Sequence, residues 1–169
     1  MKLRTILILS MALHACIHHH KSESVNQSDC YEYHFQTAQS MLFNDRLDSA
    51  KYYFDKAIAC DPLNCIYANN IAIEYYNHSK YEIAELYFQK LNTECRNNAD
   101  FILNHALNLT FLDSTEEVLR ELNRCIAISP TNCKCLYLRS VYADSPDTSL
   151  IKRMQDLECE TQIQEMKGQ

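Results

Sequence analysis

The sequence predicts an all-α fold, a short solenoid of stacked helical hairpins, and two observations carry this expectation. First, small and aromatic residues recur at a spacing of 34, in the sets Ala38, Ala72 and Ala106, and Phe54 and Phe88. A repeat of this length is typical of helix pairs that each bury one face against the next pair. Second, the chain of 169 residues has one glycine and three prolines, whereas an all-β protein would need many glycine turns.

Composition sets the broad class of the protein. Apolar residues make up 47% of the chain and charged residues 22%, so one domain with a buried core is expected. The formal net charge is −6. Nucleic acid is therefore not expected as a partner, because phosphate binding needs a basic surface.

The N-terminus is expected to be a signal peptide, residues 1–15, rather than part of the fold. Lys2 and Arg4 form a positive start, and residues 5–13 form a short apolar run. The run is too short to span a bilayer as a helix, which favours a cleaved targeting segment.

Residues 13–16, Leu-His-Ala-Cys, resemble the lipobox of bacterial lipoproteins, although His14 departs from the small residue usual there. The resemblance implies that Cys16 is diacylated and that residues 16–29 form a lipidated, flexible tether. Eight cysteines then remain, an even number that suits disulfides in an oxidising compartment. In bacterial lipoproteins, aspartate directly after the lipidated cysteine retains the protein in the inner membrane. Ile17 holds that place here, which is compatible with sorting to the outer membrane. The alternative is an ordinary secretory signal with an incidental cysteine.

The remaining chain, residues 30–169, is expected to hold three repeats and a capping unit, at about 31–64, 65–98, 99–132 and 133–166. In repeat one, a helix over 31–44 and a second over 47–60 flank a turn at Asp45-Arg46. Asp61-Pro62 ends this second helix, since the residue before a proline resists the helical region.

The inner turns of the next two repeats are expected at 77–80 and around 113–114, and Pro130 closes repeat three. In the capping unit, a first helix is expected from Cys133 to about Ala143. A second is expected to start at Ser145-Pro146-Asp147, an N-cap with proline at the first helical position, and to run to about Met166. Its polar character suits the end of a solenoid.

These residues resemble the tetratricopeptide repeat (TPR), over 31–143. Small residues stand at the eighth and twentieth places, namely Ala38 and Ala50, Ala72 and Ala84, and Ala106, with Val118 as the exception. Bulky residues stand at the twenty-fourth place, namely Phe54, Phe88 and Leu122, and Pro62 and Pro130 close their repeats. The family's tryptophan is absent, and Arg96 replaces one closing proline. The resemblance implies a right-handed solenoid of about three and a half hairpins that binds proteins.

The cysteines are expected to form disulfides that link the two helices of a hairpin at its open end. In an antiparallel pair, the start of the first helix lies beside the end of the second. The expected disulfides are Cys30–Cys60, Cys65–Cys95, Cys133–Cys159 and Cys125–Cys135. The last two pairs could exchange partners, since two of their cysteines are nearly adjacent. A metal site is the alternative, but the chain lacks the paired C-x-x-C spacing of common structural zinc sites. No metal and no cofactor is expected.

An amide ladder is the candidate binding feature, because Gln36, Asn70 and Asn104 hold the same sixth place of successive repeats. First helices line the concave face in such repeats, where amides could bond the backbone of an extended peptide. Their neighbours complete the expected groove: Phe35, Asn69, Ile73, Tyr76, Leu107 and Phe111. The alternative is that the amides serve local structure. The family's clamp for acidic C-termini needs Lys and Arg on this face, which are absent at the matching places, so that clamp is not expected.

No motif for catalysis is present: the chain has no glycine-rich phosphate loop, no G-x-S-x-G and no H-E-x-x-H. The expected function is therefore that of a non-enzymatic interaction or assembly scaffold, anchored to a membrane of the bacterial envelope, with a protein or peptide partner. One alternative is a protein resembling the cysteine-rich Sel1-like repeats, which binds or acts on cell-wall fragments. The other is a purely structural subunit of an outer-membrane complex.

Overall fold

The computed structural model describes residues 26–143 and 145–168, and all regular structure in that part of the chain is helical. The expected signal peptide, Cys16 and the tether up to residue 25 lie outside the described residues. The helices are α2 (Gln27–Phe43), α3 (Leu47–Cys60), α4 (Cys65–Asn77), α5 (Tyr81–Glu94), α6 (Ala99–Leu109), α7 (Thr115–Ile128), α8 (Cys133–Val141), α9 (Thr148–Asp156) and α10 (Glu160–Lys167). The all-α prediction is confirmed.

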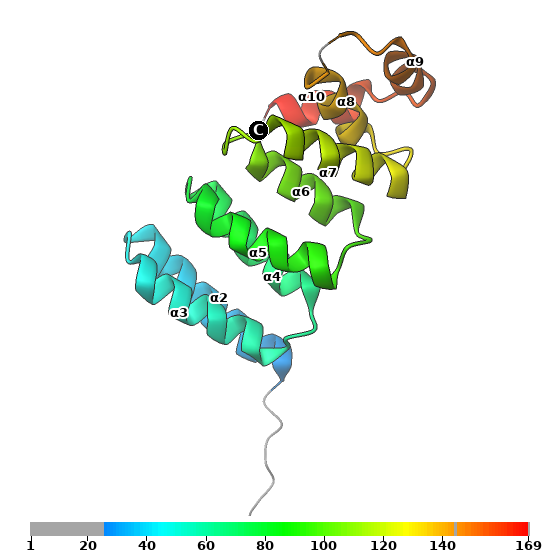
Figure 1. Cartoon of the computed structure of the whole chain (residues 1–169). Helices are drawn as coiled ribbons and strands as arrows, with labels where there is room; N and C mark the ends of the chain where they lie inside the picture. Colours follow the sequence, from blue (N-terminus) through cyan, green and yellow to red (C-terminus); the bar gives the residue numbers. More distant parts are fainter. Residues whose placement is uncertain (1–25, 144, 169) are drawn as a thin grey trace, which may run out of the picture.

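The helices pair as hairpins that stack one after another in chain order (Figure 1). Each of the first three inner turns contains one residue with positive φ: Asp45 (54°), Ser79 (57°) and Asp113 (53°). These residues are 34 apart, so the repeat extends to the backbone of the turns. In the first two turns the next amide bonds back five residues, from Arg46 to the Met41 carbonyl and from Lys80 to the Tyr75 carbonyl. Left-handed residues with such bonds end helices, and here they do so without glycine.

The first helix starts earlier than expected. α2 begins at Gln27, and the Asn26 side chain accepts a hydrogen bond from the Ser28 amide at 3.1 Å. Asp29 lies in the first turn, where a negative charge is favourable near exposed amides. The helix therefore includes residues that were assigned to the tether.

The capping unit differs from the expectation of two helices. α9 starts at Thr148, because Asp147 rather than Ser145 caps it, accepting from the amides of Ser149 and Leu150 at 3.0 and 3.2 Å. The chain then turns at Glu158, which has a φ of 51°, and continues as α10. The turn lets Cys159 reach Cys133 at the start of α8, where their Cα atoms are 5.4 Å apart.

The core follows the repeat. The small residues of the helix crossings are buried, with at most 1% of their surface exposed: Ala38, Ala50, Ala72, Ala84, Ala106 and Val118. Phe54, Phe88 and Leu122 are buried to the same degree. Phe54 from α3 meets Tyr75 from α4 edge to face, with ring centroids 5.2 Å apart. The first two hairpins therefore share one packed interior, and a second cluster of buried residues lies in the third hairpin and the start of α8.

Candidate functional site

The first helices of the hairpins form a continuous row, in which α2 contacts α4 and α4 contacts α6. This row is the face on which the amide ladder was expected. Two of its amides reach back to the preceding hairpin: Asn70 Nδ2 donates to the Tyr31 hydroxyl at 3.5 Å, and Asn104 Nδ2 donates to Asn69 Oδ1 at 3.1 Å. Burial raises the pKa of Tyr31 to about 12, so its hydroxyl stays protonated at neutral pH. These amides join neighbouring repeats.

Asn69 does not fit its expected place in a peptide groove. Only 6% of its surface is exposed, and its side-chain oxygen already accepts from Asn104. A buried amide must find partners within the protein, because an unpaired one is costly. Asn69 is therefore a contact between α4 and α6 rather than a ligand contact.

The other expected groove residues differ in exposure. Gln36 is exposed and donates to Glu32 of its own helix at 2.6 Å. Phe35, Ile73 and Leu107 are half-buried, and Phe35 and Leu107 pack against the core. Of the ladder, Gln36 thus remains the amide most open to a peptide, and the role of the ladder in binding stays a prediction.

Tyr76 and Phe111 come together with a residue that was not expected in the groove, Tyr81. Phe111 stacks on Tyr81 with centroids 4.5 Å apart, and Tyr76 meets Phe111 edge to face at 5.6 Å. Phe111 is 53% exposed. Tyr81 was detectable in principle, because it and Tyr76 flank one inner turn and must lie close together. We call these three residues the aromatic cluster.

A buried polar network joins α5, α6 and α7. His105 is 3% exposed, and its two ring nitrogens contact Glu85 Oε1 and Asn92 Nδ2, each at 2.8 Å. Asn92 accepts from Arg124 of α7 at 3.0 Å, and Asn108 donates to Glu85 at 3.0 Å. This histidine has partners on both nitrogens, as a core histidine requires, and it holds the second and third repeats together.

Burial acts to raise the pKa of Glu85, but hydrogen bonds from His105, Asn108 and Gln89 outweigh it and hold the pKa below its ordinary value of 4.5. A carboxylate with a depressed pKa stabilises the fold above its unfolded pKa, and this contribution is lost as the pH falls through the folded value. Acidification below about pH 5 should therefore destabilise the second and third repeats.

Glu85→Gln tests this dependence. We expect the variant to lose about 1–3 kcal/mol of stability at pH 7, since a charged hydrogen-bond acceptor is replaced by a neutral amide. Its melting temperature should fall less steeply than that of the wild type between pH 5 and pH 3. Thermal melts followed by circular dichroism measure both effects, with Glu82→Gln, an exposed glutamate of the same helix, as the matched control. Equal slopes in all three proteins would contradict the assignment.

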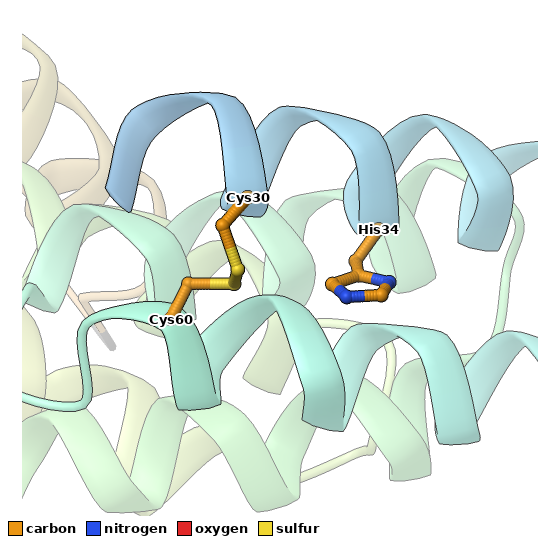
Figure 2. Close-up of side chains that lie close together, drawn as sticks. All are labelled: Cys30, His34 and Cys60. Carbon is orange, nitrogen blue, oxygen red and sulfur yellow. A yellow bond between two sulfur atoms is a disulfide. The ribbon is translucent and has the colours of Figure 1, made fainter. Parts of the chain in front are cut away.

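Four cysteine pairs form disulfides: Cys30–Cys60, Cys65–Cys95, Cys125–Cys135 and Cys133–Cys159. For the two pairs whose partners were left open, the structure contains Cys125–Cys135 and Cys133–Cys159. Three pairs close the ends of their units, and Cys125–Cys135 joins the end of α7 to the start of α8. Figure 2 shows His34 beside the first of these disulfides.

The geometry defines a class: the described chain is a solenoid of antiparallel helical hairpins with the tetratricopeptide-repeat fold. No protein-family model matches the chain, and no curated protein matches it. Solved structures do match it. The chain is similar to the TPR domain of Arabidopsis OM64, at 14% identity and a TM-score of 0.55, over 69% of this chain and 97% of that one.

Two further solved structures give the same result. MamA from Desulfovibrio magneticus has 12% identity and a TM-score of 0.58, over 78% of this chain and 76% of that one. The first TPR of Spaghetti (RPAP3), solved with an HSP90 peptide, has 17% identity and a TM-score of 0.54, over 68% and 91%. Likenesses at this identity establish the fold. Within the described ranges, none of the helices is both long and apolar enough to cross a membrane.

Proposed function

We propose that this protein is a non-enzymatic scaffold that binds a protein or peptide along the row formed by α2, α4 and α6. The observation that carries the proposal is the aromatic cluster, whose exposed Phe111 stands where α6 ends, beside the end of α4. Large, partly exposed aromatic rings are favoured anchors in interfaces, since they bury much area with few rotatable bonds. The peptide-bound RPAP3 domain shows that this fold can receive a peptide.

The partner's chemistry is constrained by the charge of the row. Glu32 and Asp100 are exposed on its helices, and Glu74 is half-buried and held by Gln39 at 2.8 Å. Three carboxylates repel an acidic tail. The proposed partner is therefore a neutral or basic extended segment that places an apolar side chain on the aromatic cluster and a backbone amide near Gln36.

We further propose that the scaffold is exported and anchored through a diacylated Cys16, with the outer membrane as its site. Support comes from the lipobox resemblance and from the eight remaining cysteines, all of which are paired. Disulfides persist in oxidising compartments and are rare in the cytosol. A lipid anchor would hold the repeats close to the partners with which they assemble.

Crosslinking in intact cells, followed by pull-down of the full chain from membranes, tests both parts. Wild type and Tyr52→Ala should capture the same amount of partner, while Phe111→Ala should capture about tenfold less, because an aromatic anchor is worth more than 1 kcal/mol. Tyr52 is the control, because it is an exposed aromatic residue on α3, outside the proposed row. Equal capture by Phe111→Ala would reject the proposed face. Cys16→Ser should leave the membrane fraction, and its retention there would reject the anchor alone.

A further inference from the structure

Cys30, His34 and Cys60 form a compact cluster at the open end of the first hairpin. Cys30 and His34 are one turn apart on α2, so their side chains share a face, and Cys60 ends α3 opposite them (Figure 2). The two sulfur atoms and an imidazole nitrogen all lie within 4.8 Å of one another. Two helices thus bring together one nitrogen and two sulfur atoms, the donor types that zinc prefers.

The imidazole of His34 is otherwise unused. Among the described residues, no hydrogen-bond partner contacts its Nδ1, although this atom is buried. Its ring neighbours are Tyr33 and Tyr53, with centroids 5.2 and 6.2 Å away. Figure 2 shows Nδ1 on the side of the ring away from the disulfide, so the nitrogen that faces the two sulfurs is Nε2. His105, by contrast, has a partner on each ring nitrogen.

We propose that opening the Cys30–Cys60 disulfide converts this cluster into a zinc site, with two thiolates and the His34 imidazole as ligands. A dithiol reductant gives two electrons and two protons to the disulfide, which becomes two thiols while the reductant closes its own disulfide. Zn²⁺ then forms two Zn–S bonds and one Zn–N bond, and the two thiol protons pass to solvent. A water completes the four-coordinate shell.

The hairpin supplies the right spacing for both states. The Cα atoms of Cys30 and Cys60 are 5.9 Å apart. After reduction the two sulfurs must separate to admit a zinc ion at about 2.3 Å from each, and rotation of the side chains achieves this without moving the helices. Both cysteines are half-buried, so a small dithiol can reach them. The metal would keep the ends of α2 and α3 joined when the disulfide is open.

The second hairpin provides a natural comparison. Cys65 and Cys95 have the same separation of 30 residues, with Cα atoms 6.3 Å apart. Four residues after Cys65, where the first hairpin has His34, stands Asn69. An amide is a far weaker ligand for zinc than an imidazole. The side chain of Asn69 is also already bonded to Asn104 of α6. The third ligand therefore distinguishes the first hairpin from the second.

The test uses the full chain, reduced with a dithiol that is then removed without air, and titrated with Co²⁺ as a spectroscopic probe for zinc. Reduced wild type should show thiolate-to-cobalt absorption that Zn²⁺ displaces. His34→Asn introduces the residue type found four positions after Cys65. It should weaken cobalt binding by about 10- to 100-fold, a loss seen even when a residue that only hydrogen-bonds to a metal ligand is replaced.

Circular dichroism of the oxidised proteins checks that each variant is folded, and His34→Gln is the substitute if His34→Asn is not. The oxidised wild type should give no thiolate-to-cobalt absorption. Equal affinity of reduced wild type and the His34 variant would overturn the proposal, since the variants keep every cysteine and all other histidines. Equal binding by oxidised and reduced wild type would overturn it as well, because the thiolates would not be required.

Discussion

Phe54→Ala is expected to lower the free energy of unfolding by about 3–5 kcal/mol, the range seen when a fully buried phenylalanine is truncated. Phe54 has no exposed surface and packs between Phe35 of its own hairpin and Tyr75 of the next, with ring centroids 5.5 and 5.2 Å away. The substitution removes apolar contacts within the first hairpin and at its boundary with the second. In a solenoid, stability depends both on contacts within each repeat and on contacts between neighbouring repeats.

Urea unfolding followed by circular dichroism measures this loss, with Tyr52→Ala as the control. Tyr52 lies on the same helix, and 56% of its surface is exposed, so its truncation should change stability by less than about 0.5 kcal/mol. A second expectation concerns cooperativity. Because Phe54 joins two hairpins, the variant should unfold its first hairpin before the rest, giving a broader transition. A loss below about 1 kcal/mol would show that the packing around Phe54 contributes little.

The hairpin boundaries followed from the sequence because each depends on local signals. Pro62 ends α3 near the expected residue, and the turns at Asp45 and Ser79 recur at the repeat spacing. The break after α9 was not predictable in this way. Glu158 adopts a left-handed conformation although glutamate has no preference for it. The Cys159 amide bonds back to the Met154 carbonyl at 3.0 Å, as in the turns after α2 and α4, but no glycine or proline marks this helix end in the sequence.

For the candidate site, the sequence predicted which helix face it occupies but not which partners its side chains have. The repeat spacing placed Gln36, Asn70 and Asn104 on the first helices, but it could not say that two of them bond to the preceding hairpin. Periodicity reports which side of a helix a residue occupies, whereas a partner depends on how two helices are offset. For the same reason His34 was not recognised beside a cysteine pair: its spacing from Cys30 is visible in the sequence, yet Cys60 is needed to complete the cluster.

Cys65→Ser combined with Cys95→Ser removes the disulfide of the second hairpin. We expect this to lower the free energy of unfolding by about 3–4 kcal/mol, because the bond closes a loop of 30 residues in the unfolded chain. A solenoid has few contacts between distant repeats, so a covalent link within a hairpin replaces what a larger core would supply. Serine at both positions avoids the free thiol that a single replacement would leave.

The matched comparison is Cys125→Ser with Cys135→Ser, which opens a loop of only 10 residues. Loop entropy predicts that this disulfide contributes about 1 kcal/mol less to the free energy of unfolding than Cys65–Cys95 does. Urea unfolding of both variants and the wild type, without reductant and with other free thiols alkylated, measures the difference. Cys125 is fully buried, whereas Cys65 and Cys95 are half-buried. If the disulfide of the shorter loop proved the more stabilising, packing around Cys125 in the native state would outweigh the restriction of the unfolded chain. The order of the two losses thus separates an entropic staple from a bond that serves mainly to position α8 against α7.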